Sequence, residues 1–438
     1  MINRRELALA AVPMAWPALG QAKPASLLHP PDLSFLREGP LVNLPRAREL
    51  MAVAGLDALV VTQAPNVFYL SGHWPQLDRM GLNQTAIAIL PRDPARPPAL
   101  VMHAFLHYYT HSDESPAGER SVYTYNQPAD RSPLYPARDE SLVTPREQRR
   151  RAAVAAVRAN VGSEAEALGR ALRDLKLDAA KLGVDAASLP IMLGGQGIDA
   201  SSVFAENTLR RIRLVKSPRE IALMRLAAQS NVDAALAAVA QARAAGDTRT
   251  LRAAFCAEAA RRGNAPVFMV IDGSSSEVMN APLTDGQAFS IDCVSSLRFY
   301  HGDFARSVFV GEPRASMKQI TAWTLRAWQD IQRSLRPGLR FADIVRIGRE
   351  SLQRQGADIR ISFTPHSVGL FHTDHPFPTP EDPTPVAGLV LEENMIISVD
   401  CPLGNAGAGG SSHLEDLLLI GAEGAQPIHR VPQNVLVV

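Results

Sequence analysis

Residues 289–310 constrain this chain most strongly, because they place two carboxylates inside apolar, strand-like sequence. Two β-prone runs flank a polar segment, a pattern that predicts a strand, a turn and a returning strand. Asp292 lies in the first run and Asp303 in the second. A carboxylate in a buried strand costs free energy unless a cation or hydrogen bonds meet it. Salt bridges to the nearby Arg298 and Arg306 are one way to meet that need.

Three later segments carry further groups of the same kind. Residues 364–376 read TPHSVGLFHTDHP, residues 393–403 read ENMIISVDCPL, and residues 410–420 read GSSHLEDLLLI. If the acids of these strands were buried together they would repel one another, and neutralising them with protons is expensive at pH 7. One or two divalent cations would solve the problem. The side chains concerned are His366, His372, His375, Asp400, Glu415 and Asp416.

Length and composition limit the class of protein. A chain of 438 residues is too long for one ordinary core, so two domains are expected. With 46% hydrophobic residues, 20% charged residues and a net charge of +1, neither a nucleic-acid-binding surface nor a membrane-binding one is indicated. No run approaches the roughly 18 apolar residues of a membrane span.

The first half alternates strand-like and helical segments, which predicts an α/β domain. Residues 112–138 are polar and rich in proline, and we expect a long loop or lid there. In the second half, Ser217 begins a helix with proline at its first position and glutamate at its third. More helices follow, and from residue 361 onward the chain is strand-like. His301 and His429 are expected at the surface.

The N-terminus and the cysteines bear on localisation. Residues 1–22 place Arg4 and Arg5 before a weakly apolar stretch that ends in small residues, which resembles a twin-arginine export signal. We therefore predict a periplasmic or exported protein, with the cytoplasm as the alternative if the two arginines belong to an ordinary N-terminus. Cys293 and Cys401 each follow a singled-out acid. Strand alternation turns these thiols away from it, so buried free thiols are favoured over a disulfide.

Taken together, the motifs resemble a known family. The order is Asp-x10-Asp, His-x-x-Gly-Leu, an acid that closes an apolar strand, and then Leu-Glu-Asp. This order resembles the pita-bread metallopeptidases of family M24, among them Xaa-Pro aminopeptidases and prolidases. Residues 46–72 resemble the creatinase/prolidase N-terminal domain, and residues 213–221 the start of the catalytic domain. The resemblance implies an α/β N-terminal domain over 23–208 and an α+β pita-bread domain over 209–438.

The family's metal ligands can be carried over residue by residue. They fall on Asp292, Asp303, His366, Asp400 and Glu415, with Asp303 and Glu415 bridging two ions. Carboxylate-rich ligation with one imidazole suits Mn²⁺ first, and Co²⁺ or Zn²⁺ as alternatives. The resemblance implies that a bridging hydroxide attacks the scissile carbonyl and that Asp400 takes the proton of the water.

Several positions depart from the family pattern. The family has Glu where this chain has Asp400, and Arg where it has His413. A substrate histidine is expected some way before the first ligand, where this chain has Ser274, Ser275, Ser276 and Asn280. His372 is interpreted as a contact for the leaving group or the substrate, and His375 and His413 as substrate residues.

Three hypotheses follow. The first is an exported dinuclear-metal peptidase of the Xaa-Pro aminopeptidase or dipeptidase type that acts on small peptides. The second keeps the fold but acts on a small non-peptide amide, amidine or sulfonium metabolite, as creatinase does on its own substrate. The third is a metal-free binding protein. Family resemblance also implies a homodimer.

Overall fold

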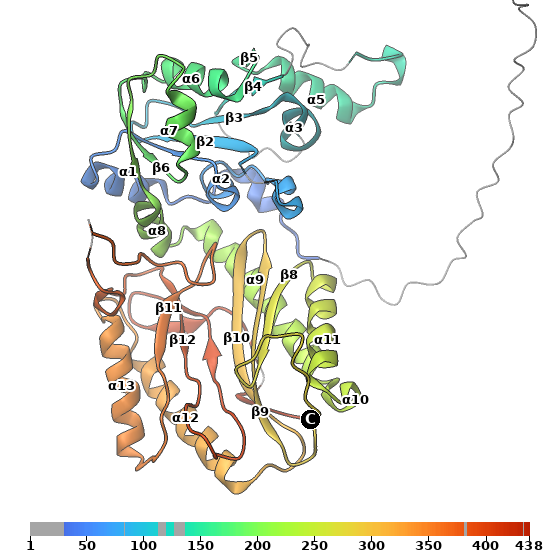
Figure 1. Cartoon of the computed structure of the whole chain (residues 1–438), viewed down its shortest axis with the longest axis vertical. Helices are drawn as coiled ribbons and strands as arrows, with labels where there is room; N and C mark the ends of the chain where they lie inside the picture. The colour runs from blue at the N-terminus through green and yellow to red at the C-terminus, as the bar shows by residue number, and fades with distance from the viewer. Residues whose placement is uncertain (1–29, 83, 113–119, 127–135, 381–382, 432) are drawn as a thin grey trace, which may run out of the picture.

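The computed structural model describes residues 30–438 except 83, 113–119, 127–135, 381–382 and 432. The predicted export signal at 1–22 therefore lies outside the described residues. Figure 1 shows two parts, one built on a single large sheet and the other on two smaller sheets with helices around them. Within the described ranges, no helix is both long and apolar enough to cross a membrane.

The N-terminal part is a three-layer α/β structure. Its seven-stranded sheet has the order β5-β4-β3-β2-β1-β6-β7. Every residue of the interior strand β1 is buried, as expected for a strand covered on both faces. The segment 112–138, predicted as one long loop, contains strand β4, so that prediction is wrong in part. The strands are β1 (Ala58–Val61), β2 (Ala86–Pro91), β3 (Ala99–His103), β4 (Ser121–Tyr125), β5 (Ala159–Val161), β6 (Lys181–Val184) and β7 (Ser201–Phe204).

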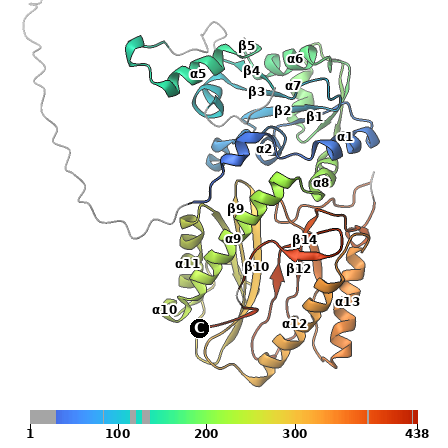
Figure 2. The same ribbon diagram turned by 180° about the vertical axis from the view of Figure 1, so that it is seen from behind.

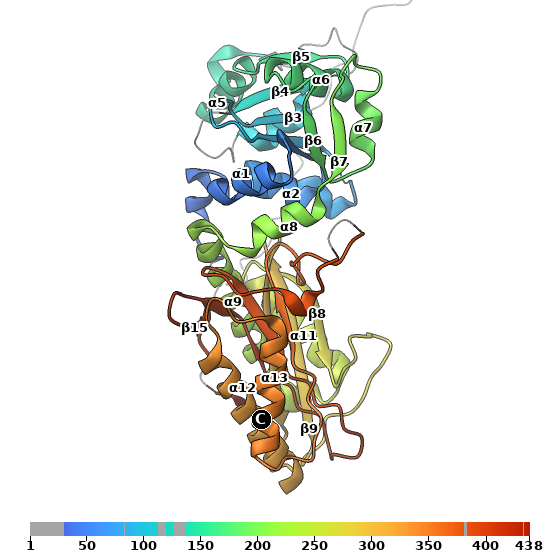
Figure 3. The same ribbon diagram turned by 90° about the vertical axis from the view of Figure 1, so that its left-hand side faces the viewer.

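Helices cover both faces of this sheet because the residues of each strand alternate between two cores. Leu59 and Val61 pack in one core with α1, α2 and α8, while Ala58 and Val60 pack in the other with α6 and α7. Figure 3 shows α8 between the N-terminal part and the rest of the chain. The helices are α1 (Leu44–Val53), α2 (Ala64–Ser71), α3 (Ala104–Leu106), α5 (Pro145–Ala155), α6 (Glu164–Asp174), α7 (Ser188–Leu193) and α8 (Glu206–Leu214). Short 3-10 or π turns are η1 (Ser34–Glu38), η2 (Gln76–Met80), η3 (His107–His111), η4 (Glu140–Leu142) and η5 (Val386–Gly388).

The first sheet of the C-terminal part contains the predicted hairpin. Strands β9 and β10 pair in antiparallel register, and β13, β8 and β16 complete the sheet. Its outer face packs on α9 and α11 through an apolar core that includes Cys293. Gly302 allows this close packing, because a Cβ there would lie 2.5 Å from Asn231 Cβ of α9. The elements are β8 (Ala265–Ile271), β9 (Ala288–Leu297), β10 (Tyr300–Phe309), β13 (Glu415–Asp416), β16 (Val435–Val437), α9 (Pro218–Val239), α10 (Ala242–Ala245) and α11 (Thr248–Arg261).

The second sheet has the order β11-β12-β14-β15 and lies against α12 and α13. In Figures 1 and 2 the helices lie outside and the two sheets lie between them. Cys401 belongs to the core under α12 and α13; it and Cys293 are buried free thiols, as predicted. The elements are β11 (Thr364–Ser367), β12 (Ile396–Asp400), β14 (Leu418–Ile420), β15 (Ala425–Pro427), α12 (Ala315–Ser334) and α13 (Phe341–Arg354).

A buried polar chain connects the two parts. The guanidinium of Arg213 donates from Nε to Asp374 at 3.0 Å and from Nη1 to Asn66 Oδ1 at 2.7 Å. Asn66 in turn donates from Nδ2 to Asp185 at 2.9 Å. Arg213 and Asp374 are almost completely buried, so their charges are compensated inside the protein. The loop that carries Asp374 also carries His372, and the N-terminal part therefore helps to position it.

The tip of the β9–β10 hairpin makes a second connection. Arg298 and Phe299 both have positive φ, at 51° and 69°, a conformation that tight hairpins more often give to Asn and Gly. The guanidinium of Arg298 lies 4.4 Å from the Trp74 ring centroid, and the Phe299 ring lies 4.9 Å from the same centroid. These contacts with the N-terminal part offset the local backbone strain.

Candidate metal centre

Three adjacent strands of the first sheet form the floor of a polar cluster. Ala305 on β10 is directly opposite Asp292 on β9 and directly opposite Glu415 on β13. Residues that are directly opposite share one face of a sheet, so both acids extend over the same small methyl group. Asp303 is two residues from Ala305 on that face. The hairpin therefore places both of its acids on the inner side.

The second sheet supplies the opposite wall. His366 on β11 is directly opposite Ser398 on β12, and Asp400 is two residues further along the same face. The Ser398 hydroxyl donates to Glu415 Oε1. His366 Nε2 lies 3.4 Å from Glu415 Oε1, 3.6 Å from Asp303 Oδ2 and 3.6 Å from Asp400 Oδ2. The five residues predicted as metal ligands therefore meet at one place between the sheets.

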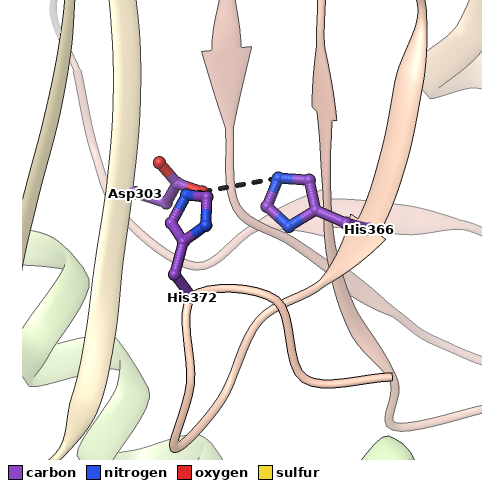
Figure 4. A group of neighbouring side chains, drawn as sticks. All are labelled: Asp303, His366 and His372. Atoms are coloured by element: carbon purple, nitrogen blue, oxygen red, sulfur yellow. Dashed lines mark ion pairs between the residues drawn. The ribbon is translucent and has the colours of Figure 1, made fainter. Parts of the chain in front are cut away.

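Two more histidines lie at this cluster. His372, on the loop after β11, has Nε2 3.2 Å from Asp303 Oδ2, and Figure 4 shows Asp303 with the rings of His366 and His372. His413, just before β13, has Nε2 3.5 Å from Asp400 Oδ1 and 3.8 Å from Glu415 Oε2. The His413 side chain is 10% exposed, whereas that of His372 is 34% exposed.

The cluster contains several buried polar atoms without hydrogen-bond partners among the described residues. Among the residues that the structure describes, Asp303, His366 and three neighbours present buried atoms that accept or donate no hydrogen bond. Such atoms cost free energy unless something else meets them. They lie where three groups of carboxylate and imidazole atoms come within 4.8 Å of one another, which is the donor set of a divalent transition-metal ion. The atoms are Asp292 Oδ1, both oxygens of Asp303, both ring nitrogens of His366, His413 Nε2 and Glu415 Oε2.

The carboxyl pKa values spread apart, as expected for acids that share a buried site. Burial and the charge of Asp303 raise the pKa of Asp292 to about 7. Burial and the charges of Asp303 and Asp400 raise the pKa of Glu415 well above its usual range. Burial alone would raise the pKa of Asp400, but the contact with His413 and the charge of His366 outweigh it and lower that pKa to about 2. The cluster therefore requires positive charge, from either protons or cations.

Salt bridges to Arg298 and Arg306 do not compensate the charges of Asp292 and Asp303 in the hairpin. Arg306 is fully buried and donates from Nη2 to both oxygens of Asp416, at 2.8 and 3.0 Å. Its Nη1 donates to the carbonyl oxygen of Glu415 at 2.8 Å. Arg298 lies against Trp74 at the hairpin tip. Arg306 thus supports the strand that carries Glu415 from behind.

Three other histidines singled out in the sequence, His375, His429 and His301, lie outside the cluster. His375 is buried outside the cluster, against the rings of Phe341 and Phe377, and its Nδ1 accepts from the amide of Ser367 at 3.4 Å. His429 is buried with Nε2 3.4 Å from Asp416 Oδ1, so its predicted surface position is wrong. His301 is only partly exposed and lies 3.4 Å from the carbonyl oxygen of Gly369, so it too is not a free surface residue.

Two family models match most of the chain. The model of metallopeptidase family M24 matches residues 222–422, and that of the creatinase/prolidase N-terminal domain matches residues 44–215. The chain belongs to metallopeptidase family M24. The predicted fold, an α/β N-terminal domain followed by an α+β pita-bread domain, is thereby confirmed.

Relatives of this M24 chain include dipeptidases. It is 29% identical over 248 residues to a protein of Mycobacterium tuberculosis described as "Probable dipeptidase PepE", a match that covers 54% of this chain and 64% of that one. It is 24% identical over 240 residues to the Xaa-Pro dipeptidase of Pyrococcus furiosus, covering 53% of this chain and 67% of that one. The match thus spans less than two thirds of the mycobacterial relative.

Solved structures share the fold along nearly the whole chain. The X-Pro aminopeptidase of Thermotoga maritima superposes with a TM-score of 0.66 at 16% identity, covering 89% of this chain and 100% of that one. The prolidase of Pyrococcus horikoshii superposes with a TM-score of 0.62 at 18% identity, covering 90% of this chain and 99% of that one. At this identity the likeness concerns the fold alone.

Sequence reasoning missed some residues of the site. Ala305 could have been identified by counting along the hairpin, because its register with Asp292 follows once the turn at 298–299 is known. Ser398 lies two residues before Asp400, and strand alternation puts the two on one face. The approach of His413 to Asp400 depends on the irregular chain between β12 and β13, for which the sequence contains no periodic signal.

Proposed function

We propose that this M24 chain is a metal-dependent peptidase of the Xaa-Pro aminopeptidase or dipeptidase type, which acts on small peptides. The observation that carries the proposal is the convergence of four carboxylates and His366 between the two sheets, where several buried atoms lack hydrogen-bond partners among the residues that the structure describes. A metal-free binding protein has no need of that arrangement, because it would bury repelling charges without compensation.

Two divalent ions fit the donor set of this site. Asp292 would hold one ion, and His366 and Asp400 would hold the other. Asp303 and Glu415 would each reach both ions. When bound, such ions polarise a scissile carbonyl and lower the pKa of a water molecule. Ser398 orients Glu415 through its hydroxyl, and Arg306 fixes the backbone carbonyl of the same residue.

Asp400 is the proposed general base. As an ionised carboxylate at neutral pH, it can accept the proton of an attacking water. Its side chain is 26% exposed, in contrast to the fully buried Asp303 and Glu415, and it is therefore within reach of solvent and substrate. Phe268 on β8, whose ring centroid lies 5.6 Å from that of His372, provides an apolar surface beside the cluster.

A panel of peptides tests the activity. Purified protein loaded with divalent metal is incubated with Xaa-Pro dipeptides, Xaa-Ala dipeptides, longer Xaa-Pro peptides and their N-blocked forms, and products are measured by mass spectrometry. We expect cleavage of unblocked peptides, and loss of cleavage in Asp303→Asn. If metal-replete protein hydrolyses none of the peptides, the peptidase proposal is wrong and small non-peptide amides become the class to test.

Export and assembly remain predictions of this proposal. N-terminal sequencing of the native protein tests the signal at 1–22: an intact Met1 in the cytosolic fraction would contradict export. Light scattering of the purified protein tests the homodimer.

A further inference from the structure

The ligand set carried over from the family contains one imidazole, but three imidazoles lie at the metal centre of this chain. The group formed by Asp303, His366 and His372 has ligand atoms that all lie within 4.8 Å of one another. A second such group consists of Asp292, His413 and Glu415. Each of these two groups thus contains one added histidine.

The distances from His413 suit a shared ion better than hydrogen bonds, and the distance from His372 is compatible with either. Donor atoms that each lie about 2.1 Å from one ion are about 3.0 Å apart at a right angle and about 3.4 Å apart at a tetrahedral angle. The nitrogen-to-oxygen distances from His413 are 3.5 and 3.8 Å, and the distance from His372 to Asp303 is 3.2 Å. Hydrogen bonds of this type are centred near 2.9–3.0 Å, so His413 lies beyond that range from both carboxylates.

The surroundings of each ring direct one nitrogen at the cluster. His413 is about nine-tenths buried, and its Nε2 has no hydrogen-bond partner among the described residues. His372 has Nδ1 3.4 Å from Thr373 Oγ1 on one side and Nε2 beside Asp303 on the other. When Nδ1 donates to the hydroxyl, Nε2 presents its lone pair to the cluster, which is the arrangement typical of histidine ligands.

We propose that His372 and His413 are metal ligands, one at each ion, so that the centre is held by three imidazoles and four carboxylates. This inference rests on the metal centre of the proposed function, and it replaces the leaving-group and substrate roles expected for these two histidines. His413 stands where the family has an arginine, which cannot bind a metal, so the added donor distinguishes this chain from the family pattern.

A consequence concerns the identity of the metal. The expectation of Mn²⁺ assumed five ligands with a single imidazole. Two further nitrogen donors shift the preference toward ions that favour imidazole, such as Zn²⁺ and Co²⁺. His413 Nε2 also lies 3.5 Å from Oδ1 of Asp400, the acid that is one methylene shorter than the glutamate of the family pattern.

Nuclear magnetic resonance of the Co²⁺-loaded full chain can count the imidazoles directly. Coordinated rings give hyperfine-shifted proton signals, and the proposal predicts three sets in the wild-type protein. His372→Gln and His413→Gln should each lose one set and keep two. His103→Gln, which removes a histidine from the N-terminal part, is the matched control and should keep all three.

The outcomes separate cleanly. A wild-type spectrum with one set, from His366 alone, overturns the inference; a variant that keeps the wild-type pattern overturns the assignment of that residue. Because the spectrum reports binding and not turnover, a protein with three sets that cleaves no peptide would leave the inference intact and refute the proposed activity. A protein that cleaves peptides but gives a single set would support the proposed activity and refute the inference.

Discussion

Replacement of Asp303 by asparagine is the sharpest test of the cation-filled cluster. The side chain is fully buried on β10, and both of its oxygens lack hydrogen-bond partners among the described residues. An asparagine at this position would keep the shape of the side chain but remove the charge that two ions would share. We therefore expect Asp303→Asn to fold and to lose metal at both positions.

The size of the effect follows from linkage. An ion present at 100 times its dissociation constant stabilises the folded state by about 2.7 kcal/mol. For a unit of 150–250 residues, that corresponds to a rise in Tm of roughly 5–10 °C per bound ion. We expect calorimetry to show such a rise when metal is added to the wild-type apoprotein, and little or none in Asp303→Asn.

The comparison within each variant removes the effect of the substitution on the apoprotein itself. Asp330→Asn provides the matched control, because Asp330 lies on α12 and accepts hydrogen bonds from the hydroxyl of Ser351 and from Arg354, away from the metal cluster. That variant should have a lower Tm and still show the full metal-dependent rise. An Asp303→Asn protein that shows the wild-type rise would refute the reasoning.

Three further predictions concern Ala305 beneath the cluster, Arg306 behind β13, and the pH dependence of stability. Ala305→Leu should fill the floor beneath Asp292 and reduce metal content measured by mass spectrometry; unchanged occupancy would mean that the floor does not limit the site. Arg306→Met should leave Asp416 buried without its arginine partner at a cost of about 3–5 kcal/mol in chemical denaturation, and a loss below about 1 kcal/mol would contradict it. Burial lowers the pKa of His73 to about 3, so its contribution to stability is complete above its usual pKa and is lost as the pH falls toward 3. Between pH 6.5 and 4.5 this amounts to about 2.3 kcal/mol, and His73→Gln should show a shallower decline in denaturant midpoint over that interval; identical slopes would rule it out.

Much of the architecture could be predicted because it depends on local patterns. The hairpin, the capping box at Ser217 and the α/β alternation each follow from residue periodicity or capping chemistry, and each is present. The arrangement of Asp292 and Asp303 on one face also follows, because strand alternation fixes it once the turn is placed. The thiols of Cys293 and Cys401 point into the outer cores for the same reason.

What could not be predicted depends on contacts between distant segments. His429 is buried because the chain near the C-terminus returns to Asp416 and because the amide of Leu417 donates to its Nε2 at 3.3 Å. Strand β4 is short and lies within polar sequence, so it is stabilised by pairing with β3 rather than by its own periodicity. The convergence of His413 on Asp400 is likewise a property of the assembled sheets.

The central claim is that cations compensate the negative charge buried between the two sheets. A crystal of the metal-loaded protein, measured at the absorption edge of the added metal, tests it most directly. The account predicts two anomalous peaks about 3.5–4 Å apart, surrounded by the carboxylates of Asp292, Asp303, Asp400 and Glu415. A map with no peak there, after loading with Mn²⁺, Co²⁺ and Zn²⁺ in turn, would contradict the account.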